Sequence, residues 1–320
     1  MSELESAVAG SSMAEYDAPL FIAWQLNATC NLKCLHCCEE AGAPAVDQMT
    51  REQMLAACAQ FVEADIPYVA LSGGEPLMCP DFWEVCECLR ASGANVKIET
   101  NGEMIDDDVA GRLGRLRLRS VQVSLDGATA KAHEALRENG DYDKVIRACN
   151  RLRSEGANTE IVFVPTRLNI HEVGDAIDIA ASLGAYGFYT GKLMRIGRAA
   201  RNWNELCPSD EQYVQFFKTL DEKTEQYRGE MKVYCYPFDV IEELRYRLTT
   251  PSASLLVLPS GKVKLIGPLP FICGDLTKTG LAEIWQRYKQ AWQDPRVVEF
   301  GRRVVDDPAL VAEANNWIEL

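Results

Sequence analysis

Long apolar runs, positive charge and repeats are scarce in this 320-residue chain, and each scarcity excludes a class of protein. No run of about eighteen apolar residues occurs, so no membrane-spanning helix is predicted. The chain has 33 Lys and Arg against 47 Asp and Glu, and its net charge of −14 argues against binding along a nucleic-acid backbone. One basic run, from Arg112 to Arg119, suits the solvated end of a helix and the turn after it. Neither nucleic acid nor a membrane is therefore expected as a partner.

The N-terminus lacks the pattern of a signal peptide. Glu3, Glu5 and Glu15 stand where a signal peptide carries basic residues and an apolar centre. The prediction is a cytoplasmic protein, in which the twelve cysteines are reduced thiols, metal ligands or core residues rather than disulfides. Residues 1–18 read as a flexible arm, and the rest of the chain is long enough to bury a sizeable core.

Three of the cysteines form a compact motif, Cys30-Asn31-Leu32-Lys33-Cys34-Leu35-His36-Cys37. The motif lies in a predicted loop directly after an apolar run, residues 20–26, that reads as a buried strand. Three sulfurs are too few for a tetrahedral structural zinc site, unless His36 or Cys38 completes it. They suit a [4Fe-4S] cluster that keeps one iron open for a ligand. At this point both metals stay open.

The next two hundred residues alternate between predicted strands and predicted helices. The strands are expected at residues 20–26, 68–71, 95–99, 120–125, 160–164 and 186–189. Such alternation demands parallel strands with right-handed crossovers, hence an α/β barrel or a doubly wound sheet.

Polar and glycine-rich segments follow the carboxyl ends of these strands. They are the cysteine loop, Gly73-Gly74-Glu75, Thr100-Asn101-Gly102, Ser124 with Asp126, and the loop that contains Arg195. In a barrel, ligands bind at this end of the strands. Glycine lets the backbone approach a ligand closely, and Glu75 is suited to accept hydrogen bonds from an amino group. The pattern predicts one site built by several loops.

Together, Cys30-x3-Cys34-x2-Cys37 and Gly73-Gly74-Glu75-Pro76 resemble the motifs of the radical S-adenosylmethionine (SAM) superfamily, over roughly residues 20–200. The resemblance implies a partial, TIM-like (β/α)6 barrel. It also implies that Cys30, Cys34 and Cys37 hold a [4Fe-4S] cluster whose fourth iron chelates the amino and carboxylate groups of SAM. One electron, from a flavodoxin- or ferredoxin-type donor, would then cleave SAM to methionine and a 5′-deoxyadenosyl radical that abstracts hydrogen from the substrate.

The resemblance also implies how SAM is held. Its amino group would meet Gly73, Gly74 and Glu75, and its adenine would lie near His36. The ribose and methionine parts would contact Asn101, Ser124 and Asp126, and the carboxylate of SAM would contact Arg195.

Residues from about 230 onward are similar to the SPASM/twitch extension of radical SAM enzymes that modify peptides. A β-hairpin over residues 254–266 is followed by a helix that contains Leu281 and Trp285, and Gly197-Arg198-Ala199 also fits that subgroup. The predicted division is an arm (1–18), a core barrel (19–230) and a small α+β extension (231–320).

This extension departs from the usual pattern, because Ile266-Gly267-Pro268 stands where a cysteine for an auxiliary cluster is expected. Cys207, Cys235 and Cys273 are one short of the four thiolates of an ordinary cluster. The prediction is therefore a degenerate extension and a single cluster. The alternative is a second, auxiliary cluster with a ligand other than cysteine. A further hypothesis makes Cys235 or Cys273 a hydrogen-atom donor, although both also fit as small buried residues.

The predicted function is the modification of a ribosomally made peptide, or of a peptide-derived precursor, by cross-linking, decarboxylation or epimerisation. Because the N-terminus leaves no room for a domain that binds a leader peptide, a separate delivery protein is expected as a partner. A small-molecule substrate (a sugar, nucleoside or tetrapyrrole) is the alternative within the superfamily. The alternative outside it is a zinc-stabilised binding module without catalysis.

Overall fold

The computed structural model describes residues 13–320, and its strands form one continuous sheet. The strands are β1 (Phe21–Asn27), β2 (Tyr68–Gly73), β3 (Asn95–Thr100), β4 (Ser120–Ser124), β5 (Thr159–Phe163), β6 (Gly187–Thr190), β7 (Lys232–Cys235), β8 (Ser254–Val257), β9 (Lys262–Lys264), β10 (Phe271–Asp275) and β11 (Ile318–Glu319). The first six coincide with the predicted strands to within two residues at each end.

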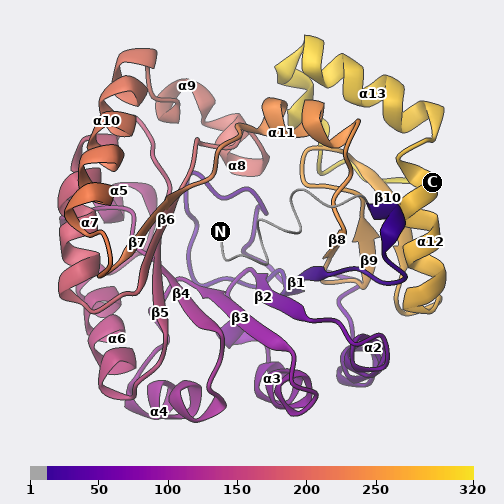
Figure 1. Ribbon diagram of the computed structural model, residues 1–320, viewed down its shortest axis with the longest axis horizontal. Helices are drawn as coiled ribbons and strands as arrows, with labels where there is room; N and C mark the ends of the chain where they lie inside the picture. Colours follow the sequence, from indigo (N-terminus) through magenta and orange to yellow (C-terminus); the bar gives the residue numbers. More distant parts are fainter. Residues whose placement is uncertain (1–12) are drawn as a thin grey trace.

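The helices connect the strands, and most of them lie on the outer face of the sheet (Figure 1). They are α2 (Arg51–Glu63), α3 (Phe82–Ala91), α4 (Asp107–Leu116), α5 (Ala130–Leu136), α6 (Tyr142–Ser154), α7 (Val173–Ser182), α8 (Gly197–Arg201), α9 (Trp203–Leu206), α10 (Asp210–Gln226), α11 (Val240–Arg247), α12 (Leu281–Ala291) and α13 (Pro295–Asp306). Short 3-10 turns occur at Met13–Glu15, Pro76–Met78, Ile170–Glu172 and Pro308–Glu313.

The sheet order is β11-β10-β9-β8-β1-β2-β3-β4-β5-β6-β7. From β8 through β1 to β7 all neighbouring strands run parallel, and β9 then turns back antiparallel to β8. Within residues 13–320, β7 and β8 do not pair, so the sheet curls into a barrel that stays open. The predicted fold, a partial α/β barrel, is confirmed.

Residues of β1 alternate between the two faces of the sheet, as strand geometry requires. Ile22, Trp24 and Leu26 are fully buried, and the indole of Trp24 meets the ring of Phe61 on α2 edge to face at 5.3 Å. The intervening residues Phe21 and Ala23 instead line a cavity inside the barrel. The apolar core therefore lies between sheet and helices, and the barrel interior is left for a ligand.

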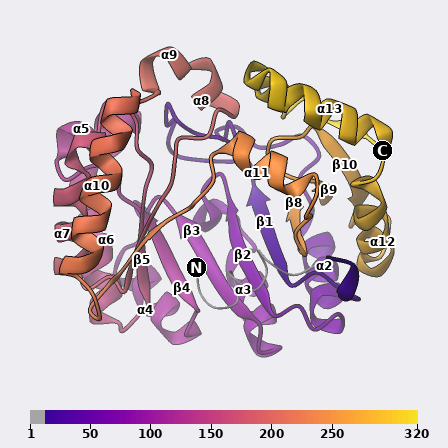
Figure 2. The same ribbon diagram turned by 45° about the horizontal axis from the view of Figure 1, so that its top comes forward.

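The carboxyl ends of the parallel strands share one side of the molecule. Figure 2 shows β1 to β4 running toward the side on which α8 and α11 lie. Every polar loop that the sequence places after a strand therefore emerges on that side.

The C-terminal segment joins the barrel sheet from both ends. β7, which the sequence did not predict, pairs with β6, and β8 pairs with β1. The division at residue 230 stays a prediction, since strands on both of its sides belong to one sheet.

Of the predicted arm, residues 1–12 lie outside the described residues. Beyond them, the carbonyl of Tyr16 accepts a hydrogen bond from the indole of Trp285 at 2.9 Å, which holds this part against α12. Among residues 13–320 no helix has both the length and the apolarity that a membrane span requires.

Candidate active site at the carboxyl ends of the strands

A cavity of about 800 Å³ opens at the carboxyl ends of the strands. Its wall brings together many of the residues that the sequence predicts for the site: Cys30, Cys34, His36, Cys37, Gly73, Gly74, Asn101 and Ser124. They come from the loops after β1, β2 and β3 and from the end of β4. Residues far apart in the sequence thus meet on one surface because parallel strands end on one side.

Arg198 of α8 fixes the backbone of the cysteine loop. Its N–H donates to the carbonyl of Cys37 at 2.9 Å, and its guanidinium donates to the carbonyls of Cys34 (2.8 Å) and Ala41 (2.7 Å). The loop has no helix or strand of its own to satisfy these carbonyls. Gly197, at φ +58°, permits the approach, since a Cβ there would lie 2.3 Å from the carbonyl oxygen of Cys38.

A buried ion pair supports the opposite side of the loop. Asp126 is 0% exposed and Arg137 is 7% exposed. The Asp126 carboxylate accepts hydrogen bonds from Nε of Arg137 at 2.8 Å and from the backbone N–H of Val164 at 2.8 Å. Nε2 of His36 lies 3.1 Å from the same carboxylate. Although burial alone raises the pKa of the Asp126 carboxyl, Arg137 and His36 hold it well below its usual range.

Gly73 and Gly74 lie directly against the loop after β1. A Cβ on Gly73 would lie 2.4 Å from the carbonyl oxygen of Asn27, and one on Gly74 would lie 2.1 Å from that of Thr29. The N–H of Gly74 donates to the Asn27 carbonyl at 2.7 Å. Only glycine allows this contact, which leaves the bare backbone of Gly73 and Gly74 in the cavity wall beside the cysteines.

The Glu75 carboxylate points away from the cavity. It is 0% exposed and accepts hydrogen bonds from the Thr100 hydroxyl (2.7 Å) and from the backbone N–H groups of Asn101 (2.8 Å) and Leu77 (3.1 Å). Burial raises its pKa to about 7 in spite of these donors. The carboxylate therefore ties the loop after β2 to the loop after β3.

The three motif thiols fit an iron-sulfur cluster better than a single ion. Nowhere in residues 13–320 do three His, Cys, Asp or Glu side chains stand close enough to hold one metal ion, as zinc requires. A cubane needs no such convergence, because each thiolate binds a different iron. Hydrogen-bond donors already face two of the sulfurs: Leu32 N–H at 3.4 Å from Sγ of Cys30, and Nη1 of Arg137 at 3.7 Å from Sγ of Cys34. Burial raises the pKa of Cys34 to about 11, which Arg137 opposes and metal binding would overcome.

Residues 24–180 match the family model described as the radical SAM superfamily. The chain carries a radical SAM domain. Mycofactocin maturase MftC of Mycobacterium tuberculosis is 35% identical over 211 residues, which are 66% of this chain and 54% of that protein. The AdoMet-dependent heme synthase of Methanosarcina barkeri is 26% identical over 297 residues, 86% of this chain and 84% of that protein. The chain spans about half the length of the maturase relatives that it matches.

Solved structures share the fold over most of this chain. SuiB of Streptococcus suis bound to S-adenosylmethionine has a TM-score of 0.71 at 14% identity, covering 89% of this chain and 68% of that one. SuiB bound to the precursor peptide SuiA has a TM-score of 0.70 at 13% identity, covering 88% of this chain and 66% of that one. The likeness at this identity is one of fold. The radical SAM domain matched at residues 24–180 implies a [4Fe-4S] cluster and SAM as cofactors.

Five of the residues predicted for the radical SAM site lie outside the cavity wall: Glu75, Asp126, Arg195, Cys235 and Cys273. The carboxylates of Glu75 and Asp126 are occupied by protein donors, which leaves the predicted contacts with SAM without geometric support. The guanidinium of Arg195 instead lies over the ring of Trp203, at 5.4 Å.

Neither candidate hydrogen donor reaches the cavity. Sγ of Cys235 lies 3.6 Å from the Tyr236 carbonyl, and Sγ of Cys273 lies 3.4 Å from the Val263 carbonyl. Tyr234 and Tyr236 line the cavity in place of Cys235, because alternate residues point to opposite sides. The donor hypothesis therefore gains no support from the geometry.

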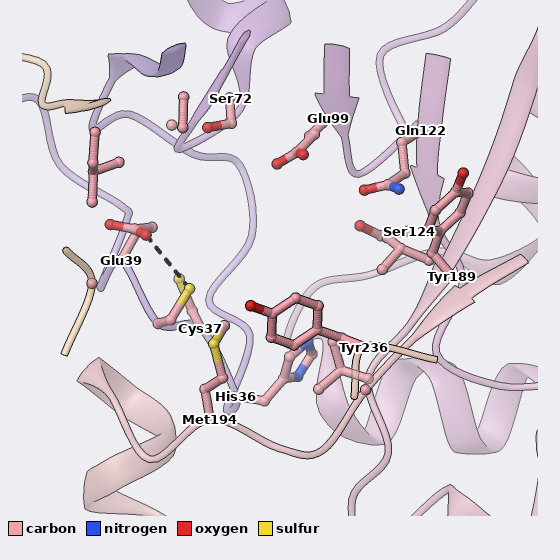
Figure 3. Close-up of a pocket in the computed structure, with 18 of the residues that line it drawn as sticks. His36, Cys37, Glu39, Ser72, Glu99, Gln122, Ser124, Tyr189, Met194 and Tyr236 are labelled. Atoms are coloured by element: carbon pink, nitrogen blue, oxygen red, sulfur yellow. Dashed lines mark hydrogen bonds between the residues drawn. The ribbon is translucent and has the colours of Figure 1, made fainter. Parts of the chain in front are cut away.

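Several side chains in the wall were not predicted from the sequence, among them Glu99, Gln122 and Tyr236, whereas Ser124 was predicted. In Figure 3, Glu99, Gln122 and Ser124 border one side of the cavity, and the ring of Tyr236 lies between them and Cys37. Some of these residues could have been identified from the sequence, because polar residues recur at every second position of β3 and β4 (Lys97 and Glu99, Gln122 and Ser124). No comparable sequence pattern indicates that Arg137 belongs to the wall.

Proposed function

We propose that this chain is a radical SAM enzyme that binds one [4Fe-4S] cluster through Cys30, Cys34 and Cys37. The main support for the proposal is that these thiols and the bare backbone of Gly73 and Gly74 line the same cavity. When bound, the cluster supplies the electron that cleaves SAM and so starts hydrogen abstraction from a substrate. The protein's part is to place SAM between the cysteine loop and the glycines, and to exclude water around it.

The residues around this space suit the parts of SAM. Gly73 and Gly74 offer backbone groups to the amino group, while Asn101, Ser124 and His36 line the same wall. The Asn101 amide donates to Oδ1 of Asn31 at 2.8 Å and to Sγ of Cys30 at 4.0 Å, and it accepts from the N–H of Glu103 at 3.0 Å. These contacts pre-position the wall before any ligand arrives.

We propose a peptide as the substrate. MftC is named as a maturase, and SuiB has been solved with a precursor peptide. The cavity wall opposite the cysteines is rich in aromatic rings (Tyr189, Tyr234, Tyr236 and Phe238), and it lies where the sheet stays open. Such a wall offers stacking and apolar contact to a chain that enters from the open side.

A tetrapyrrole is the second candidate substrate, and one observation favours it. The heme synthase matches 86% of this chain and 84% of its own length, whereas MftC is matched over about half of its length. A mass change on a peptide encoded beside this chain would support the first candidate. Conversion of a supplied tetrapyrrole without such a change would support the second.

We further propose that the chain holds a single cluster. Cys273 is buried in the core, Cys235 lies at the end of β7 and Cys207 follows α9. These three thiols are also one fewer than the four of an ordinary cluster. A flavodoxin- or ferredoxin-type electron donor, a separate peptide-delivery protein and a cytoplasmic location stay predictions.

The test of the core proposal is product analysis after anaerobic cluster reconstitution. With SAM and dithionite, the protein should form 5′-deoxyadenosine and methionine in equal amounts, and Cys34→Ala should form neither. Cys207→Ala is the matched control, since this cysteine lies outside the cavity wall, and it should behave as the parent protein. Absence of 5′-deoxyadenosine from a protein loaded with iron would overturn the proposal.

A further inference from the structure

Arg137 occupies a position that neither the sequence motifs nor the family match assigns. Its guanidinium lies between the Asp126 carboxylate and the thiol of Cys34, inside the cavity wall. We propose that Arg137 sets the reduction potential of the cluster by donating a hydrogen bond from a buried positive charge to the Cys34 thiolate. This inference rests on the proposed function, which places the cluster at Cys34.

The direction in which the guanidinium points is fixed by its anchor. Nε and Nη2 of Arg137 bind one oxygen of Asp126, at 2.8 and 2.7 Å, and Nη1 is left to face the sulfur at 3.7 Å. Asp126 is itself held through its other oxygen by the Val164 N–H at 2.8 Å. Its backbone carbonyl also accepts a bond from Asn169 at 2.9 Å. Arg137 is thus a rigid donor rather than a mobile charge.

The charge of Arg137 is permanent. A guanidinium stays protonated in proteins, and the Asp126 carboxylate pairs with it at 2.7 Å. At 7% exposure, the interaction with the sulfur is poorly screened by water or salt.

The thiols differ in the donors that face them. Sγ of Cys30 meets two neutral donors, the Leu32 N–H and the Asn101 amide, whereas Sγ of Cys34 meets a charged guanidinium. Hydrogen bonds to cluster sulfurs and nearby charge are principal determinants of cluster potential. Reduction adds one electron, hence one negative charge, so a buried cation stabilises the reduced form and makes the potential less negative. Arg137 therefore acts on the reaction indirectly, as a positioning residue that makes the cluster easier to reduce.

The experiment is a redox titration of the reconstituted full chain, without SAM, followed by electron paramagnetic resonance with dithionite as reductant. For Arg137→Gln we expect about a tenfold smaller ratio of reduced to oxidised cluster at a fixed potential, which is a shift of about 59 mV to more negative values. Arg137→Lys keeps the charge but not the fork of donors and should shift less. Arg201→Gln is the matched control, because it removes a guanidinium that is 66% exposed and lies outside the cavity wall, and its potential should equal that of the parent.

Three results would overturn the inference. The first is a parent-like potential in Arg137→Gln at about four irons per chain. The second is weaker SAM binding with an unchanged potential, which would make Arg137 a ligand of SAM instead. The third is loss of the cluster from both variants, which would make it a structural support of the loop. If the parent protein itself bound no iron, the proposed function would fail, which is a distinguishable outcome.

Discussion

The two walls of the cavity are built in different ways. On the cysteine side, single side chains fix the backbone of several loops: Arg198 binds the cysteine loop, and Glu75 joins the loops after β2 and β3. On the opposite wall, the contacts beside the aromatic rings include bonds from side chain to side chain, as between the Tyr236 hydroxyl and Glu243 at 2.8 Å. Lys192 there bridges to Asp239 at 3.2 Å.

This difference separates two tasks. A cofactor of constant shape calls for a fixed backbone, whereas a wall of aromatic rings at an open sheet edge accommodates different substrates through side-chain changes. Changes on the cysteine wall should therefore impair cofactor binding strongly. Changes on the aromatic wall should spare it.

The largest effect is expected for Gly74→Ala. A Cβ 2.1 Å from the Thr29 carbonyl oxygen forces the loops after β1 and β2 apart, which should weaken SAM binding at least about tenfold, or about 1.4 kcal/mol. Equilibrium binding of SAM to the reconstituted protein measures this. Gly42→Ala is the control in the same region, because a Cβ there has no heavy atom within 4 Å. Equal affinity in both variants would contradict the fixed-backbone account.

Arg198→Met should have the next largest effect. It removes the guanidinium bonds to the carbonyls of Cys34 and Ala41, and we expect the free energy of unfolding to fall by about 2–4 kcal/mol. Iron retained after gel filtration should fall with it. Arg201→Met on the same helix is the control, since its side chain is 66% exposed and pairs with Glu40 at the surface. Similar losses in both variants would show that α8, rather than the Arg198 contacts, matters.

Glu75→Gln should alter the pH dependence of stability. The pKa of Glu75 is raised from 4.5 to about 7 in the folded chain, so between these values the folded state binds more protons than the unfolded state. Stability must therefore decrease as pH rises from 4.5 to 7, by about 3 kcal/mol for this group. Denaturant unfolding of the metal-free chain at several pH values should show a flatter profile for Glu75→Gln. Parallel profiles would contradict the raised pKa.

Tyr236→Phe should have the smallest effect on the cofactors. The change removes only the hydroxyl that bonds Glu243 on the aromatic wall. Iron content and SAM affinity should stay within about twofold of the parent, a difference of about 0.4 kcal/mol, while turnover of the substrate changes. A large loss of iron would contradict the prediction that changes on the aromatic wall leave cofactor binding intact.

The fold and the position of the site could be predicted from the sequence, whereas the roles of several single side chains could not. Apolar runs and loop signatures are local, so the strands and the shared rim could be predicted from residues such as Cys30 and Gly73. Glu75 was recognised, but the inward turn of its carboxylate depends on Thr100 and Asn101, which no local pattern reveals.

The arginines were harder still to predict. Arg137 and Arg198 meet Cys34 across 103 and 164 residues of sequence. Contacts of this kind arise only once the chain has folded. Strand β7 was missed for a related reason, since its four residues form a strand only beside β6.

The most direct test of the central claim is the amount of iron and zinc per chain after anaerobic reconstitution. We expect about four irons, no zinc, and loss of the iron in Cys34→Ala but not in Cys207→Ala. About eight irons would show that the C-terminal cysteines hold a second cluster. Stoichiometric zinc without iron would contradict the radical SAM assignment of this cavity altogether.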